Sequence, residues 1–307
     1  MFSKSELMKA LKSKFVSKAN NLQDILDNID FDNHDPTNLF NNLNNQLSEI
    51  VYDSDFTDIK FSSSNNYSLV HSTRGNCVYL KHHYDFEDHE IDKVYDIHDH
   101  PLVLNFGISS SKNIYTEFLY TNLSHFINSS KGAYFSNTQK AIIALEIALA
   151  LQFAHRKGVI HGQLIPETIW LDDRGKVKLD FTKEKLDIFL IGSQLTFFFA
   201  PNIIKGDKPT EKDDIYSFGT ILYALNSMTV PIITKYEEPR NIPITGNSTM
   251  QNIITQCLKD NPTSRISLDE IIQIMIDSDF QIFDNVDSIF VLERYRKIRK
   301  FEKSLTA

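Results

Sequence analysis

One stretch of the sequence, residues 136–179, restricts the fold more than any other. It opens with a capping box formed by Ser136 and Gln139. The run that follows carries apolar side chains at the spacing of one helix face: Ile142, Leu145, Leu149 and Phe153. Residues 159–171 come next, then the turn signal 172–175, then residues 176–179, which alternate like a short strand. We therefore expect a loop held between a long buried helix and two short strands.

The loop sequence GVIHGQLIPETIWLDDRGKVKL resembles the catalytic loop of eukaryotic protein kinases, whose pattern is H-R-D-L-x-x-x-N. The frame of the pattern is present at His161, Leu164, Pro166, Glu167 and Ile169. The resemblance covers residues 58–278. It implies an α+β protein with the bilobal protein-kinase fold over residues 53–278, with a small β-rich N-lobe (53–118) and a mainly helical C-lobe (119–278).

The residues that would carry the chemistry of this loop are replaced. Gln163 stands where the family has its catalytic-base aspartate, and Thr168 stands where it has a magnesium-binding asparagine. Gly162 replaces the arginine that pairs with an activation-loop phosphate. Loss of a positioned general base costs about 10²–10⁴-fold in rate. The resemblance therefore implies a pseudokinase, which acts as a signalling scaffold or allosteric partner.

The family places a magnesium-binding Asp-Phe-Gly after this loop, and two alignments of Asp180-Phe181-Thr182 are open. Without a gap, Phe181 takes the metal-ligand position. No catalytic residue is then intact at His161, Gln163, Thr168 or Phe181, and no metal is held. With a strand one residue shorter, Asp180 takes that position. The alternative function is then a divergent, weakly active Ser/Thr or Tyr kinase that binds Mg-ATP weakly through Lys81 and Asp180.

The nucleotide cleft of the family would be built by the N-lobe. Short strands are predicted at residues 59–61, 67–70, 77–81, 103–106 and 114–118. The resemblance places Lys81 at the family's strand-3 lysine and makes Glu90 its partner on the following helix. Residues 116–119 resemble the hinge between the lobes, so Glu117 and Leu119 join Tyr79 in a vestigial cleft.

Two departures in this region oppose nucleotide binding. The family's three glycines let backbone N–H groups approach phosphates closely, and the matching positions hold Ser63, Asn65 and Ser68. Tyr79 replaces a small alanine, and its ring would fill the volume of the adenine, since a packed site cannot absorb added bulk freely. We expect protein side chains in the cleft and no cofactor.

Other motifs of the family follow in order. Asp214 in DIYSFG implies a buried carboxylate that accepts hydrogen bonds from the loop backbone. Ala200-Pro201-Asn202 resembles Ala-Pro-Glu with an amide for the acid. The amide can still hydrogen-bond the matching Arg265, but the family's buried charge pair is expected to become a one-sided contact. The apolar runs 188–191 and 197–199 predict either collapse into the cleft or a docking surface. The stretches DIYSFGTILYAL and CLKDNPTSRIS resemble the tyrosine-kinase-like branch.

The two ends of the chain carry further helical patterns. Residues 1–52 predict a helical extension, with an unfolded asparagine-rich tail as the alternative. Residues 279–307 predict a basic amphipathic helix with apolar positions Val291, Tyr295, Ile298 and Phe301. We expect it to dock on its own domain, with peripheral membrane contact disfavoured, and to be dispensable for folding. The alternative is that it completes the core.

Composition narrows the remaining function classes. The chain has 307 residues and a formal net charge of −8, which gives no reason to expect a nucleic-acid partner. Two distant cysteines, Cys77 and Cys257, argue for a reducing compartment. No apolar run reaches signal-peptide or transmembrane length. We expect a cytoplasmic protein whose partners are proteins, with an active kinase as one candidate. An unrelated helical adaptor would require the ordered motif matches to be accidental.

Overall fold

The structure is a computed structural model that describes most of the chain from residue 56 onwards. The described residues are 56–58, 67–72, 78–82, 93–109, 113–117, 119, 121–127, 135–172, 174–182, 193–231, 242 and 246–305. Several predictions lie outside them, namely the N-terminal extension 1–52, the strand at 59–61, Ser63, Asn65, Glu90 and the apolar run 188–191.

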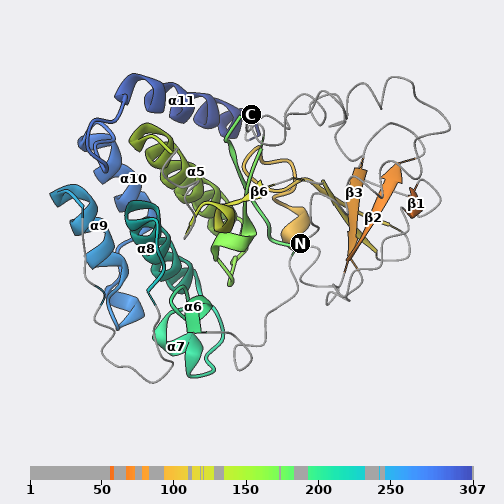
Figure 1. Cartoon of the computed structure of the whole chain (residues 1–307), viewed down its shortest axis with the longest axis horizontal. Helices are drawn as coiled ribbons and strands as arrows, with labels where there is room; N and C mark the ends of the chain where they lie inside the picture. The colour runs from red at the N-terminus through yellow and green to blue at the C-terminus, as the bar shows by residue number, and fades with distance from the viewer. Residues whose placement is uncertain are drawn as a thin grey trace. The chain divides into compact units, whose positions relative to one another are not determined.

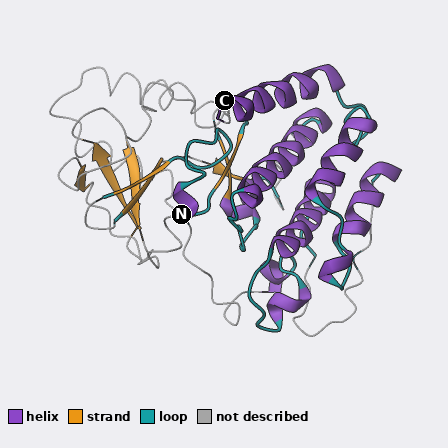
Figure 2. Ribbon diagram, turned by 180° about the vertical axis from the view of Figure 1, so that it is seen from behind, coloured by secondary structure: helices purple, strands orange, loops and turns teal. Residues whose placement is uncertain are grey.

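The chain forms two compact units. We call the first the strand unit, which comprises residues 1–91, 104–120 and 172–174. We call the second the helical unit, which comprises residues 92–103, 121–171 and 175–307. The expected α+β class, with a small strand-rich part and a larger helical part, is confirmed (Figure 2).

The strand unit contains an antiparallel five-stranded sheet with the order β1-β2-β3-β5-β4. Its strands are β1 (Phe56–Asp58), β2 (Tyr67–Ser72), β3 (Val78–His82), β4 (Phe106–Ile108) and β5 (Ile114–Glu117). β3 lies at the centre, and its Tyr79 faces Val70 of β2 on one side and Glu117 of β5 on the other. Side chains directly opposite each other share a face of the sheet, so this register fixes the neighbours of Tyr79.

The strand predicted at residues 103–106 is wrong in its bounds, because β4 begins only at Phe106. Val103 instead forms an isolated parallel bridge to Leu179, and the N–H of Leu179 donates to the carbonyl of Leu102 at 2.7 Å. Leu102 and Val103 are fully buried. A short apolar run fits a buried connection as well as a strand, and periodicity alone does not separate the two.

The helical unit is built around α5 (Asn137–Arg156), whose capping box at Ser136 and Gln139 is confirmed. Residues 141–152 of α5 are all buried, and the helix packs against α8, α10 and α11 (Figure 1). The remaining helices and 3-10 turns are η2 (Leu123–His125), η4 (Pro166–Thr168), α6 (Ser193–Thr196), α7 (Pro201–Ile204), α8 (Glu211–Ser227), α9 (Ser248–Cys257), η6 (Pro262–Ser264), α10 (Leu268–Asp277) and α11 (Ser288–Leu305).

A small antiparallel sheet with the order β6-β7-β8 flanks the loop. Its strands are β6 (Thr121–Asn122), β7 (Ile169–Leu171) and β8 (Val177–Leu179). Ile169 pairs with Leu179 and Leu171 with Val177, and all four side chains are buried. The loop is thus held by a buried helix before it and a buried strand pair after it, as the sequence predicts.

The C-terminal helix α11 is part of the core of the helical unit. Its Val291 and Ile298 are buried among the residues that α5 contacts. Arg294 on the same helix places its Nε 3.3 Å from Oε1 of Glu146, a fully buried carboxylate on α5. The other oxygen of Glu146 accepts a hydrogen bond from the N–H of Val177 at 2.8 Å. These contacts favour the alternative in which α11 completes the core over a dispensable tail.

Candidate functional site

The candidate site is the loop 159–168, and its position is fixed by Asp214 in the first turn of α8. The Asp214 side chain is 1% exposed. Its carboxylate accepts hydrogen bonds from the backbone N–H groups of His161 and Gly162, both at 2.8 Å. It also accepts one from Nε2 of His155 at 2.8 Å. A carboxylate can only accept, so the Asp214 side chain holds the end of α5 and the start of the loop together.

Gly162 takes a backbone conformation that other residues adopt rarely. Its φ is +72°, in the left-handed region, and a Cβ there would lie 3.4 Å from Cβ of Pro209. A side chain at this position would be strained by its own backbone. The glycine therefore fits the loop as it stands, whereas the family pattern has an arginine at this position.

The hydroxyl of Thr168 is bonded inside the loop. The residue is fully buried, and its Oγ1 accepts from the N–H of Ile165 at 3.2 Å. The same oxygen lies 2.9 Å from the carbonyl of Ile165 and 3.0 Å from the carbonyl of Gln163, and its single hydrogen is donated between them. Thr168 thus closes the turn η4 from within, and the contacts of its hydroxyl are structural.

Gln163 lies at the tip of the loop. Its backbone N–H donates to Nδ1 of His161 at 3.3 Å, and its carbonyl accepts from Thr168. Its side chain is half-buried and ends in an amide. An amide donates and accepts hydrogen bonds but does not take up a proton at neutral pH, so this position has no general base.

Asp180 follows directly after β8 and is tied back to the loop. Its N–H donates to the carbonyl of Thr168 at 3.0 Å. Its Oδ1 accepts from the N–H and the hydroxyl of Thr182, at 2.9 and 2.7 Å. The ring of the next residue, Phe181, lies 4.7 Å from that of His161. The structure therefore brings His161, Thr168, Asp180 and Phe181 together, with Asp180 buried and its Oδ1 bonded within its own turn.

The imidazole of His161 is neutral at pH 7. Burial lowers its pKa below the ordinary value, and the carboxylates of Asp214 and Asp180 offset only part of that effect. Because Nδ1 accepts from the N–H of Gln163, the proton of the neutral ring is on Nε2. Within the described part of the chain, this buried Nε2 has no hydrogen-bond partner.

The residues predicted for the nucleotide cleft lie in the strand unit. Tyr79 and Lys81 are two residues apart on β3 and so share one face of the sheet. Tyr79 is 7% exposed and faces Val70 and Glu117, while Nζ of Lys81 lies 5.9 Å from the ring centre of Tyr115. Oε1 of the buried Glu117 accepts from the N–H of Asn105 at 2.8 Å, and Leu119 is also buried. The Tyr79 ring is thus packed on the face that carries Lys81.

The amide of Asn202 accepts a hydrogen bond from Arg265, as expected, but the prediction that Arg265 is left with a one-sided contact is wrong. Arg265 is 3% exposed and its Nη1 donates to Oδ1 of Asp213 at 2.9 Å, a buried ion pair. Asn202 is at the edge of this group, with its Oδ1 3.4 Å from Nη2 of Arg265. Asp213 therefore supplies, from the first turn of α8, the negative charge that the family pattern would place at position 202.

Sequence reasoning missed three partners in the helical unit: His155, Asp213 and Glu146. The sequence contained a weak signal for each, because a charged or titratable side chain within or beside a mainly apolar helical run needs a buried partner. Nothing in the sequence said which partner it would find.

The described part of the chain meets neither the requirements of a metal site nor those of a membrane-spanning helix. Over those residues, no group of three or more histidine, cysteine, aspartate or glutamate side chains is placed to hold a metal ion. None of the helices described is long and apolar enough to cross a membrane. With its hydroxyl bonded in the loop, Thr168 does not fit the position of the family's magnesium-binding asparagine.

Comparison with known proteins shows what this chain is similar to. The family model for the protein kinase domain matches residues 87–275. The serine/threonine/tyrosine-protein kinase HT1 of Arabidopsis thaliana is 27% identical over 198 residues, which cover 57% of this chain and 50% of the relative. The Aurora kinase of Patiria pectinifera is 28% identical over 195 residues, covering 57% of this chain and 47% of the relative.

A third relative covers more of the chain. The probable serine/threonine-protein kinase gdt4 of Dictyostelium discoideum is 25% identical over 279 residues, 78% of this chain and 17% of the relative. The chain thus spans about half the length, or less, of these curated relatives.

Proposed function

The chain belongs to the protein kinase domain family, and from this premise we propose that it is a pseudokinase, a kinase-like domain that acts in signalling by binding other proteins. The observation that carries the proposal is the amide of Gln163 at the base position of a loop that is otherwise fully anchored. An active kinase, whose state such a domain could bias, is one candidate partner. The proposal includes the tyrosine-kinase-like branch, no cofactor and a cytoplasmic location.

The anchoring of the loop supports a chemical loss of activity and not a structural one. Asp214 holds the backbone of His161 and Gly162, so the loop has a defined shape. Kinase chemistry depends on positioned charges, a base and metal ligands. At positions 162, 163 and 168 this loop presents a glycine, an amide and an internally bonded hydroxyl. A well-formed loop that is neutral at these three positions is suited to holding a surface for recognition.

Tyr79 supports the absence of nucleotide binding. A ligand that approaches the Lys81 ammonium across its face of the sheet meets the Tyr79 ring two residues away. The ring is already packed in the strand unit, so making room for adenine would require it to leave its site. The chain's own residues oppose the nucleotide at the sheet as well as at the loop.

A second candidate is a divergent, weakly active protein kinase. It is favoured by the contact between Phe181 and His161, because Phe packing in the family's Asp-Phe-Gly accompanies a metal-binding aspartate. In this reading, Asp180 and Lys81 would hold Mg-ATP. Against it stands Thr182, whose two donors already bind Oδ1 of Asp180.

A phosphotransfer assay separates the two candidates. The full chain is incubated with labelled ATP, Mg²⁺ or Mn²⁺ and generic protein substrates, beside the Lys81→Ala and Asp180→Asn variants. We expect no incorporation above either variant. Incorporation that depends on Lys81 and Asp180 would establish the divergent kinase and refute the pseudokinase.

Nucleotide binding is tested by thermal melting with and without Mg-ATP. A ligand present at about 100 times its dissociation constant stabilises the native state by roughly 2.7 kcal/mol, so millimolar ATP would reveal micromolar binding. We expect an unchanged midpoint for the wild type. A rise that disappears in Lys81→Ala would show that the Tyr79 ring does not exclude the nucleotide.

A further inference from the structure

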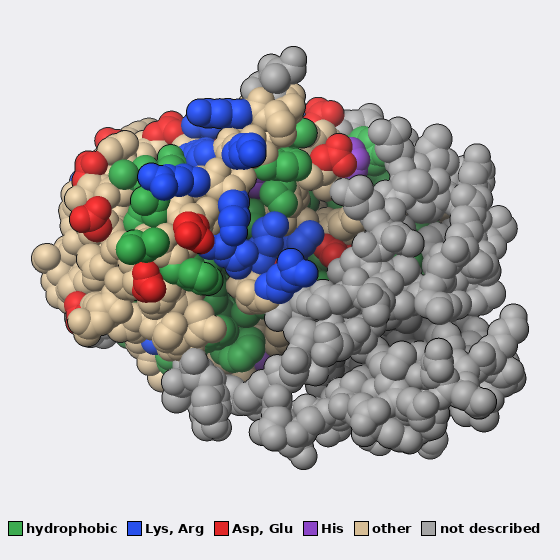
Figure 3. Space-filling model, turned by 90° about the horizontal axis from the view of Figure 1, so that it is seen from above, with side chains coloured by type: hydrophobic (Ala, Val, Ile, Leu, Met, Phe, Trp, Pro, Cys, Tyr) green, Lys and Arg blue, Asp and Glu red, His purple; other side chains and the backbone are tan. Residues whose placement is uncertain are grey.

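The helical unit carries a basic groove between the C-terminal end of α5 and α11, which pack against each other. The groove has a volume of about 770 Å³. Six cations line it: Arg156, Lys157, Arg296, Arg299, Lys300 and Lys303. Figure 3 shows Lys and Arg side chains gathered in this way on one face of the molecule. In a chain with a formal net charge of −8, this is a local concentration of the opposite sign.

The cations on α11 form a row. Positions 296, 299, 300 and 303 are spaced i, i+3, i+4 and i+7, which places them on one face of the helix. From Arg296 to Lys303 the row is about 10 Å long, at 1.5 Å per residue. An extended peptide advances about 3.3 Å per residue, so three to four residues span the row.

The charges of the groove are only partly neutralised by the protein. Its lining contains one carboxylate, Glu302, and this is bonded to Arg299 at 2.6 Å. Arg156 pairs with Asp269 at 3.1 Å, where both side chains are mostly exposed and the pair is weak. Lys157, Arg296 and Lys300 are exposed and form no ion pair with the described residues. An anionic ligand would find three cations available.

Two aromatic residues, Phe153 and Tyr295, also line the groove, and each ring is packed against a neighbouring side chain. Phe153 stacks on the buried ring of His100 with 4.2 Å between ring centres. Tyr295 lies under the guanidinium of Arg299, 5.3 Å from its ring centre. Fixed rings between charged side chains supply apolar contact area to a bound chain at a low cost in conformational entropy.

We propose that this groove binds an acidic peptide segment of a protein partner, with the row on α11 contacting successive carboxylates or phosphorylated side chains. The site stands independently of phosphotransfer, because it involves no residue of the loop 159–168. Arginine guanidinium groups match carboxylates and phosphates in a bidentate geometry, and lysines add unspecific attraction.

Membranes and nucleic acids fit the groove less well. The apolar residues Val291 and Ile298 of α11 are buried in the core. The exposed apolar residues of the helix, Ile289, Phe290 and Leu305, lie at its two ends, so no continuous apolar stripe runs along it to enter a lipid surface. A long polyanion would be repelled by the net negative charge of the rest of the chain. A short acidic segment in a concave site avoids both costs.

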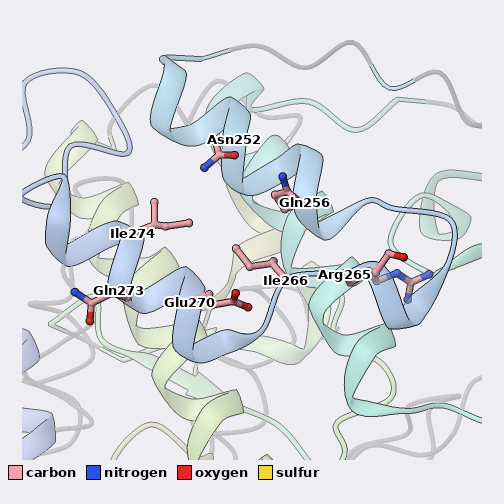
Figure 4. A pocket seen from close by; sticks show the side chains of 8 residues that line it. Asn252, Gln256, Arg265, Ile266, Glu270, Gln273 and Ile274 are labelled. Atoms are coloured by element: carbon pink, nitrogen blue, oxygen red, sulfur yellow. The ribbon is translucent and has the colours of Figure 1, made fainter.

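A second hollow, between α9 and α10, has different chemistry (Figure 4). It is lined by amides and apolar side chains such as Asn252, Gln256 and Ile274. The carboxylate of Glu270 in it is bonded to Ser267, and Arg265 is paired with Asp213. This hollow has no excess charge to select a ligand.

The test measures the binding of a labelled polyglutamate peptide to the full chain, with a polyglutamine peptide of the same length as the neutral probe. The groove variant is Arg296→Glu with Lys300→Glu. The matched control is Lys208→Glu with Lys259→Glu, two exposed lysines that do not line the groove and give the same change in net charge. Thermal melting checks that both variants fold.

We expect binding of the acidic peptide only, weakened by added salt and reduced at least about tenfold in the groove variant but not in the control. Peptide binding that survives in the groove variant overturns the proposal, as does the absence of binding in the wild type. Vesicles of phosphatidylserine and a mixed-sequence oligonucleotide are the remaining arms. Tighter binding to either than to the peptide assigns the groove to that ligand and also overturns it.

Discussion

The buried carboxylates of the helical unit and the loop 159–168 differ in charge. Three buried carboxylates of the helical unit have defined partners. Asp214 bonds to His155 and to two backbone N–H groups. Asp213 pairs with Arg265, and Glu146 contacts Arg294 and the N–H of Val177. In the loop, positions 162, 163 and 168 hold a glycine, an amide and a hydroxyl. The groups that fix the loop's shape are present, whereas those that the family's chemistry needs are neutral.

This difference separates two roles that the loop combines in the family pattern: keeping a fixed shape and carrying the groups for the chemistry. A buried carboxylate is tolerated only when its partners are in place, so one substitution in such a pair can destabilise the protein. The loop tip carries no such charge. We therefore expect substitutions of the buried carboxylates or their partners to change stability strongly, and substitutions in the loop to change it less.

The largest effect is expected when α11 is disturbed, because this helix supplies both apolar burial and the counter-charge of Glu146. Deleting residues 288–307 should abolish the cooperative thermal transition. The point variant Ile298→Ala should cost about 2–5 kcal/mol, the usual loss for a buried isoleucine. Its matched control on the same helix is the exposed Ile289→Ala, which should change stability by less than about 0.5 kcal/mol. Equal midpoints for the two variants would contradict the assignment of α11 to the core.

The second effect concerns the relocated ion pair. Arg265→Ala leaves the buried Asp213 without its counter-charge and should cost about 3–5 kcal/mol in chemical denaturation. Asn202→Ala removes only a contact of 3.4 Å and should cost less than about 1 kcal/mol. If Asn202→Ala proves the more damaging of the two, Asp213 is not the partner that neutralises Arg265.

Asp214→Ala should destabilise the protein by about 3 kcal/mol, because three hydrogen-bond donors lose a charged acceptor. The exposed Asp207→Ala is the control and should melt like the wild type. Hydrogen exchange at the N–H groups of His161 and Gly162 should rise in the first variant alone. Unchanged protection there would mean that the loop keeps its shape without Asp214.

Inside the loop, Thr168→Val should cost about 1–2 kcal/mol, since the N–H of Ile165 loses its acceptor. Thr255→Val on an exposed face of α9 is the control for replacing a hydroxyl, with less than about 0.5 kcal/mol expected. Neither substitution should create phosphotransfer. A neutral effect of Thr168→Val would show that its hydroxyl is free for another role.

The smallest effect is the contribution of His161 to acid sensitivity. Its folded pKa lies below that of the unfolded chain, so the folded state binds fewer protons and the His161 contribution to stability is lost as pH falls below about 6.5. His161→Gln should therefore flatten the decline of the melting midpoint between neutral and mildly acidic pH. An unchanged slope in this variant would indicate that His161 is protonated as easily in the folded state as in the unfolded one.

Local patterns predicted the elements around the site correctly. The capping box at Ser136, the buried face of the helix that follows and the two short strands on either side of the turn at 172–175 depend on residues close in sequence. Helix caps and apolar periodicity act over one or two turns, so they can be read without the fold. The strand at 103–106 failed because a buried connection has the same apolar signature.

The sequence by itself determined the family frame and the identity of the groups at the loop tip, because an amide at position 163 is an amide in any fold. Only the tertiary structure decided which charges meet. Asp213 and Arg265 are 52 residues apart in the sequence. Arg294, which contacts Glu146 of α5, belongs to the C-terminal helix α11. A buried charge requires a partner, but the partner is selected by the packing of helices that are distant in sequence, and no local pattern encodes that choice.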